Sequence, residues 1–281
     1  MKKIIITLIS FILIIITFIF YNNYLKTNPK LINKLSEINI TKTDIDLKKY
    51  IFSKEKYYIS QNYERYIKYQ TNHIDLKPDE IIRQVNSNLD YEFYTNVSKA
   101  DLSKNNLILV NKYYYLEKDY EPELVKMDSN YSKDGWYMQE EAYNHFKEMV
   151  DAAKKEDIII YNISSYRSYY SQDKIYNRYV NNDGKTNADT YSARPGYSEH
   201  QTGLASDINT TSDNFEFTKQ YEWLKDNSYK FGFILRYPKD KEYITGYQFE
   251  PWHYRYVGIE VAKFIFENDI TFEEYYAKYV K

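Results

Sequence analysis

Residues 4–21 form an apolar run of 18 residues, IIITLISFILIIITFIFY, without a charged side chain. A helix of this length spans about 27 Å at about 1.5 Å per residue, close to the thickness of the hydrocarbon core of a bilayer. A helix that is apolar on every side has no face to turn toward water, so it does not suit the surface of a globular domain. The run therefore predicts a membrane-spanning helix, with the rest of the chain folding beside the membrane.

Lys2 and Lys3 precede this run, and the positive-inside rule then places the N-terminus in the cytosol and everything after the helix outside. The alternative is a cleaved signal peptide, which has an apolar region of about 7–15 residues and ends at a small-residue site. The sequence FYNNYL at 20–25 offers no such site, and the absence of cysteine excludes a lipoprotein. We expect an uncleaved anchor at residues 1–21.

The part of the chain beyond the anchor is mildly acidic. Without Lys2 and Lys3 it carries 36 basic and 40 acidic residues, a net charge of −4, so it has no basic footprint for nucleic acid. The lack of cysteine also excludes disulfides, iron–sulfur clusters and thiol catalysis. Residues 22–64 are polar and contain no glycine, which indicates a stalk or linker with some helix. The folded domain is expected at 65–281, with a catalytic core at about 105–281.

Hydrophobic spacing predicts the helices and strands of the folded domain. Apolar residues recur every three or four positions over 137–154, which is typical of an amphipathic helix. A second helix is predicted at 169–180, with Ser168 as its cap and Ile175 and Tyr179 facing inward. Other helices are expected from Pro78 onward, at 221–229, after Gly258 to about 267, and after the capping box TFEE that begins at Thr271. Strands are expected at 107–110, 158–161, 233–236 and 253–257.

Glycine is distributed unevenly. All seven glycines lie at or after Gly135, and five lie between Gly196 and Gly258. Glycine is the residue that tolerates tight backbone conformations. We therefore expect the functional site in the C-terminal third of the chain.

Two of the four histidines lie near residues with metal-binding or proton-transfer chemistry. His200 is followed by Asp207, and Glu250 precedes His253 by three positions. An odd separation places two residues on opposite faces of an unbroken strand. His200 and Asp207 can therefore meet only if the chain bends between them, and Gly203 is where a bend is easiest.

His200, Asp207 and His253 together offer two nitrogens and one carboxylate. Catalytic zinc takes three protein ligands of this kind and leaves a fourth position for water, whose pKa zinc lowers toward about 7. Glu250 is then the candidate general base. The residues alone leave this open, because such a trio also arises by chance in a chain of 281 residues.

The segments around these residues have the form of two known motifs. SEHQTGLASD at 198–207 fits S-x-H-x-x-G-x-A-x-D, and EPWH at 250–253 fits E-x-W-H. SSYRS at 164–168 with Gln172, and FILRYP at 233–238, fit further segments of the same pattern. In this order the chain resembles the VanY-type D-alanyl-D-alanine carboxypeptidases. That zinc peptidase family also includes LD-carboxypeptidases that trim cell-wall stem peptides.

The resemblance implies a zinc ion on His200, Asp207 and His253, with Glu250 as general base. It also implies an α+β fold, a small antiparallel sheet with packed helices that carries the zinc site. A membrane-anchored carboxypeptidase would follow, which removes the C-terminal D-alanine from peptidoglycan stem peptides outside the cell. Whether it is a DD- or an LD-carboxypeptidase depends on the shape of the pocket, which the sequence leaves open.

Three further positions match the family pattern. Arg167 falls on the arginine that polarises the scissile carbonyl or holds a substrate carboxylate, although its position before a helix also suits a surface arginine. Gln172 and Ser198 fall on substrate-facing positions, and each also suits a capping or hydrogen-bonding role.

The alternatives are an endopeptidase of the same family, an inactive zinc-stabilised cell-wall binding module, and a membrane-tethered scaffold without metal. The presence of Glu250 and Arg167 favours an enzyme, because a binding module needs neither.

Overall fold

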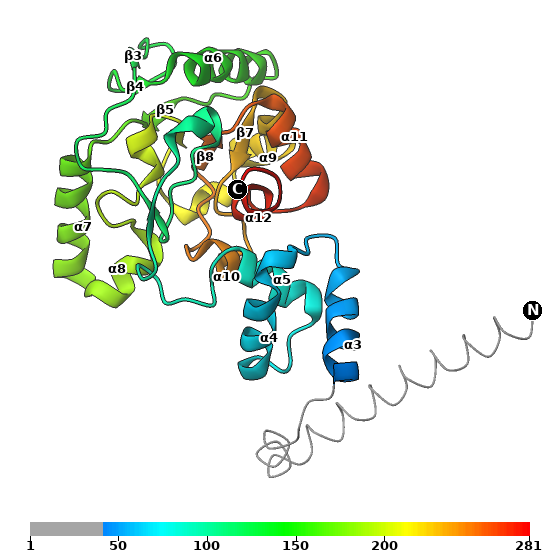
Figure 1. Cartoon of the computed structure of the whole chain (residues 1–281). Helices are drawn as coiled ribbons and strands as arrows, with labels where there is room; N and C mark the ends of the chain where they lie inside the picture. The colour runs from blue at the N-terminus through cyan, green and yellow to red at the C-terminus, as the bar shows by residue number, and fades with distance from the viewer. Residues whose placement is uncertain (1–41) are drawn as a thin grey trace, which may run out of the picture. The chain divides into compact units, whose positions relative to one another are not determined.

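The computed structural model describes residues 42–281 (Figure 1). The chain divides into two compact units, residues 1–51 and 52–281. The described part of the first unit, residues 42–51, belongs to helix α3 (Lys42–Ser53). The predicted anchor and residues 22–41 of the predicted stalk lie outside the described residues. Within residues 42–281, no helix combines the length and the apolar character that crossing a bilayer requires.

The second unit begins with helices that share one core. Phe52, Tyr57 and Tyr63 are buried, although they fall in the segment assigned to the stalk. They belong to the same apolar cluster as helix α5 (Pro78–Asn86), which begins at a proline as predicted. The apolar face of this helix consists of Ile81, Ile82 and Val85, and all three side chains are buried.

The remaining elements follow in chain order. The further helices are α4 (Tyr63–Asn72), α6 (Glu140–Lys155), α7 (Tyr169–Asp183), α8 (Lys185–Tyr191), α9 (Lys219–Asn227), α10 (Glu242–Thr245), α11 (Ile259–Asn268) and α12 (Phe272–Tyr279). The short 3₁₀ turns are η1 (Ser60–Asn62), η2 (Leu102–Leu107), η3 (Glu199–Thr202), η4 (Asp213–Phe217) and η5 (Ser228–Phe231). Two small strand pairs are β1 (Ser98–Lys99) with β2 (Tyr114–Tyr115), and β3 (Val125–Lys126) with β4 (Tyr137–Met138).

A four-stranded antiparallel sheet organises the second unit, as predicted. Its strand order is β5 (Asn162–Ser164), β6 (Ala205–Ile208), β8 (His253–Tyr256) and β7 (Phe233–Leu235).

Successive side chains of a strand point to opposite faces of the sheet. On one face Tyr254 and Tyr256 join the apolar core with helix α6, which borders this part of the molecule in Figure 1. Asp207 and His253 are cross-strand partners on the other face.

The amphipathic helices match the prediction because the spacing of their apolar residues shows which side is buried. Ser168 caps α7, its Oγ accepting a hydrogen bond from the Ser171 amide, and the Thr271 capping box starts α12. The buried side of α7 differs from the prediction. Its inner residues are Gln172 and Tyr176, whereas Ile175 and Tyr179 are only partly buried.

Two predicted strands are wrong. Residues 107–110 are apolar and largely buried, but they join no sheet. The Ile108 carbonyl pairs with a side chain instead, accepting a hydrogen bond from Arg255 Nη2 at 2.8 Å. Residues 158–161 complete the turn after α6, where the Ile158 amide bonds the Ala153 carbonyl, and the strand begins only at Asn162. Burial alone therefore did not distinguish a strand from an extended loop. Helix α8 was not predicted.

Candidate metal centre

His200, Asp207 and His253 come together on the polar face of the sheet. One ligand atom from each lies within 4.8 Å of the other two, and all three side chains are buried. Asp207 Oδ2 is 3.4 Å from His200 Nε2, and Asp207 Oδ1 is 3.1 Å from His253 Nδ1. The convergence that the spacing left open is therefore present in the structure.

Gly203 provides the bend between His200 and Asp207. It ends the turn η3 in the left-handed conformation, with φ of +70°, and the chain then enters β6. A Cβ atom at this position would lie 2.6 Å from Leu124 Cδ2, so a side chain does not fit without displacing Leu124. The bend brings His200 to Asp207 despite their odd separation in sequence.

Hydrogen bonds orient the two imidazole rings differently. His200 Nδ1 donates to the Ser165 carbonyl at 2.7 Å, which leaves Nε2 facing Asp207. His253 presents Nδ1 to Asp207, and its Nε2 has no hydrogen-bond partner among the described residues. In metal sites a ligating histidine binds through one nitrogen while an acceptor holds the other. The nitrogens that face the shared Asp207 carboxylate are His200 Nε2 and His253 Nδ1, so these are the candidate ligand atoms.

The electrostatics of the three side chains favour a bound cation. Burial would raise the pKa of the Asp207 carboxyl, but His200 and His253 hold this pKa well below its usual range. Burial lowers the pKa of His200. Burial would also lower the pKa of His253, yet hydrogen bonding to Asp207 raises it to about 9, so a metal must displace that proton. Two imidazoles and one carboxylate are a donor set of catalytic zinc, and the site fits this ion.

Glu250 and Arg167 adjoin the three residues. Glu250 Oε2 lies 3.6 Å from His253 Nδ1, and Arg167 Nη2 lies 3.7 Å from Asp207 Oδ2. Burial raises the pKa of Glu250 to about 8, against the opposing effect of His253. A carboxyl group with a raised pKa can both take up and release a proton near neutral pH. A proton acceptor and a cation thus lie next to the candidate metal ligands.

The predicted site residues all line one cleft, with a volume of about 350 Å³. Gln172 Oε1 accepts a hydrogen bond from Arg167 Nη1 at 2.8 Å, and its Nε2 donates to the Ala193 carbonyl at 2.7 Å. Both ends of this amide are used, so Gln172 supports Arg167. Ser198 is 5% exposed and lies in the wall of the cleft.

A buried charge cluster, which was not predicted from the sequence, lies behind the site. Glu199 Oε1 accepts from Arg236 Nε at 2.8 Å and from Arg255 Nη1 at 2.9 Å. Burial would raise the pKa of Glu199, but the two arginines hold it well below its usual range. The available signal was the presence of Arg236 and Arg255 in two predicted strands that are otherwise apolar or aromatic. A buried charge needs a partner of opposite sign, so these arginines indicated a buried carboxylate nearby.

Known proteins resemble this chain in sequence and in fold. The family model VanY, described as D-alanyl-D-alanine carboxypeptidase, matches residues 135–259. The protein YodJ of Bacillus subtilis (strain 168) is 43% identical over 210 residues, which cover 69% of this chain and 77% of YodJ.

Two solved structures extend the comparison. The LdcB LD-carboxypeptidase has a TM-score of 0.61 at 44% identity, covering 66% of this chain and 91% of the LdcB chain. A mutant of the D,D-pentapeptidase VanY in complex with Zn(II) has a TM-score of 0.54 at 39% identity, covering 60% and 98% of the respective chains.

Proposed function

This chain belongs to the VanY family of D-alanyl-D-alanine carboxypeptidases, and we propose that it removes the C-terminal D-alanine from peptidoglycan stem peptides outside the cell membrane. It is a zinc peptidase of the D-alanyl-D-alanine carboxypeptidase type. The observation that carries the proposal is the buried group of His200, Asp207 and His253 in the wall of the cleft, with Glu250 beside it.

In this proposal His200 Nε2, His253 Nδ1 and the Asp207 carboxylate hold the zinc ion. When bound, zinc acts as a Lewis acid that polarises the scissile carbonyl and lowers the pKa of a water molecule. The Ser165 carbonyl accepts a hydrogen bond from His200 Nδ1 and thereby fixes the orientation of the His200 ring toward the metal.

Glu250 accepts a proton from the attacking water and delivers it to the amino group of the departing D-alanine. The burial that raises its pKa to about 8 suits both halves of this transfer. The carboxylate must first bind a proton, and the carboxylic acid must then release it.

Arg167 stabilises the negative charge that develops on the carbonyl oxygen. Its guanidinium donates to Ser164 Oγ at 2.9 Å and to Gln172 Oε1 at 2.8 Å, so it is held in place before substrate arrives. A preorganised donor to an oxyanion typically contributes about 3–4 kcal/mol. Gln172 and Ser198 shape the part of the cleft that receives the peptide.

The relatives support a peptide that ends in D-alanine. VanYB has been solved in complex with D-alanine-D-alanine, and the LdcB structure concerns peptidoglycan recognition by an LD-carboxypeptidase. The family thus contains both specificities. A pentapeptide ending in D-Ala-D-Ala and a tetrapeptide ending in a single D-Ala distinguish them.

We further propose that residues 1–21 anchor the enzyme in the membrane. The part of the predicted stalk before Phe52 then connects this anchor to the domain, because Phe52, Tyr57 and Tyr63 belong to the domain core. The apolar run with Lys2 and Lys3 before it supports this orientation. The full chain should sediment with membranes and require detergent for release. Protease added to intact cells whose wall has been removed should digest the domain. Complete protection of the domain from the protease would contradict the proposed orientation.

The decisive experiment measures D-alanine released from the two stem peptides by purified protein, with and without a chelator. We expect release that a chelator abolishes and added Zn²⁺ restores. Release that resists the chelator would contradict the metal mechanism. Mass analysis of digested cell wall detects cleavage inside cross-links, the endopeptidase outcome. Stoichiometric zinc without turnover would indicate a binding module.

A further inference from the structure

Glu199 lies directly behind His253. Its side chain is completely buried, and Oε2 lies 3.7 Å from His253 Nε2. Neither of these two atoms has a hydrogen-bond partner among the described residues. Two complementary polar atoms that are buried, unpaired and face each other at this distance need only a small ring rotation to form a hydrogen bond.

Two arginines fix the orientation of the Glu199 carboxylate. Arg236 and Arg255 both donate to Oε1, at 2.8 and 2.9 Å. Arg255 is held in turn by the Asn106 and Ile108 carbonyls, at 3.0 and 2.8 Å. Since Oε1 is occupied by two donors, Oε2 remains directed at the imidazole.

We propose that Glu199 is a positioning residue that accepts a hydrogen bond from His253 Nε2–H and thereby fixes the tautomer in which Nδ1 is free to bind zinc. A neutral imidazole carries its proton on one nitrogen only. An acceptor at Nε2 therefore leaves the lone pair on Nδ1, the atom that faces Asp207. This inference rests on the proposed role of His253 as a metal ligand.

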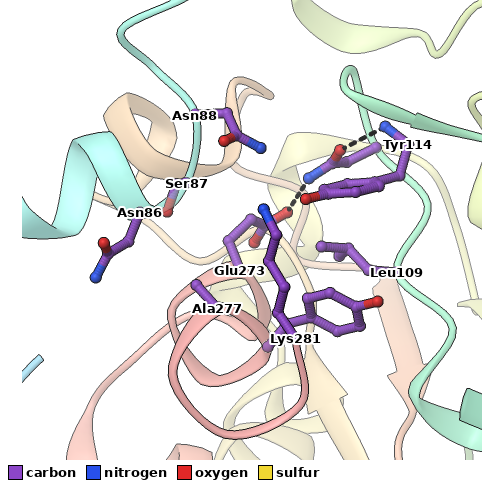
Figure 2. A pocket seen from close by; sticks show the side chains of 10 residues that line it. Asn86, Ser87, Asn88, Leu109, Tyr114, Glu273, Ala277 and Lys281 are labelled. Carbon is purple, nitrogen blue, oxygen red and sulfur yellow. Dashed lines mark hydrogen bonds between the residues drawn. The ribbon is translucent and has the colours of Figure 1, made fainter. Parts of the chain in front are cut away.

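The competing explanation is that Glu199 only neutralises the two buried arginines. Glu273 provides a matched control for that role. It is also buried, its Oε2 accepts from Arg236 Nη1 at 2.9 Å, and among the described residues no hydrogen bond or ion pair joins it to His253. Figure 2 shows Glu273 at a small cavity, of about 10 Å³, which shares no lining residue with the cleft. Glu273 Oε1 also accepts a hydrogen bond from Asn111 Nδ2 at 3.3 Å.

The two variants E199Q and E273Q separate these explanations. In E199Q the arginines attract the amide oxygen, so the amide NH₂ faces Nε2 and favours the opposite tautomer. We expect E199Q to bind Zn²⁺ about 10- to 100-fold more weakly, measured by competition with a chromophoric chelator. The visible spectrum of the Co²⁺-substituted protein should change as well. E273Q should unfold at a lower temperature yet keep the wild-type zinc affinity within about twofold.

Equal zinc affinity and equal Co²⁺ spectra in E199Q and wild type would overturn the proposal. So would a loss in E273Q as large as that in E199Q, since it would assign the effect to the arginine cluster. H253A tests the underlying metal role separately. If zinc binding survives in H253A, the proposed ligand set is at fault and not the function of Glu199.

A measurement on unmutated site residues covers the case in which E199Q fails to fold. The remaining histidines, His73 and His145, lie outside the site and can be removed as H73Q and H145Q, leaving two imidazoles to assign. Nitrogen-15 NMR of the zinc-loaded protein should show a proton on His253 Nε2 and none on Nδ1. A proton on Nδ1 with a bare Nε2 would refute the proposal.

Discussion

Glu250 performs the proposed proton transfer with a side chain that is 12% exposed and whose Oε2 lies 3.6 Å from His253 Nδ1. Replacing its carboxylate by an amide removes the proton acceptor and leaves His200, Asp207 and His253 unchanged. We expect E250Q to keep stoichiometric zinc and to lose about 10²- to 10⁴-fold in kcat. The exposed Glu267 on α11 supplies the control E267Q, which should retain full activity. An active E250Q would remove Glu250 from the role of base.

Lys112 gives a prediction at residue scale that is independent of the metal. It is 2% exposed, its Nζ donates to the Asp189 carbonyl, and it lies 4.2 Å and 4.4 Å from the ring centroids of Phe93 and Tyr247. Burial lowers its pKa to about 8, against the opposing effect of Asp189. Below this pH the folded protein must hold a buried charge.

The pH dependence of stability follows from that pKa. Between about pH 8 and 10.5 the unfolded lysine keeps its proton while the folded one has lost it, so stability rises with pH in this window. The free energy of unfolding of wild type minus that of K112M should rise by about 2–3 kcal/mol from pH 7 to pH 10. Urea unfolding of both proteins measures it. A difference that stays flat across this range would show that Lys112 keeps its proton when folded.

Which residues the sequence could reveal depends on how far apart their partners lie. His200, Asp207 and His253 were predictable because each sits in a short motif. Glu199 belongs to the same motif, but its contacts with Arg236 and Arg255 span 37 and 56 positions. No local pattern records such a contact, so its role emerges only from the folded chain.

At the scale of elements, the turn η3 and the strand β6 depend on Gly203. G203A would force a residue with a Cβ atom into left-handed backbone and against Leu124. We expect a loss of about 1–3 kcal/mol in stability and weaker zinc binding, because the bend sets the distance between His200 and Asp207. Thermal unfolding and zinc titration measure the two effects.

Gly184 supplies the control for this substitution. It also has positive φ, +78°, but a Cβ atom there would meet nothing within 4 Å. G184A should therefore lower stability through backbone strain and leave zinc affinity unchanged. Equal zinc affinity in the two variants would mean that the bend at Gly203 can shift without disturbing the site.

Elements were predictable where one side meets a core and the other meets water. Helix α6 shows this contrast, with buried Phe146 and Met149 among exposed charges. Residues 107–110 lack the contrast, and the Ile108 carbonyl pairs with Arg255, which lies far away in the sequence, so no local pattern distinguishes this segment from a strand. The antiparallel order of the sheet came from the resemblance, because short strands carry little information about their partners.

At the scale of the whole molecule, zinc binding should be coupled to folding of residues 52–281. The three candidate ligands come from η3, β6 and β8, so an unfolded chain cannot present them together. A ligand that binds only the folded state stabilises it by about 2.7 kcal/mol at a hundredfold excess over Kd. For a unit of this size that corresponds to a rise in Tm of about 5–10 °C.

The variant D207N separates this coupling from a general effect of salt or metal. An amide replaces the carboxylate that lies between His200 and His253, with nearly the same shape. We expect zinc to raise the Tm of wild type, a chelator to reverse the rise, and D207N to show almost no shift in calorimetry. A Tm shift of equal size in D207N would mean that the stabilising metal binds elsewhere on the chain. The group of His200, Asp207 and His253 would then not be the metal site.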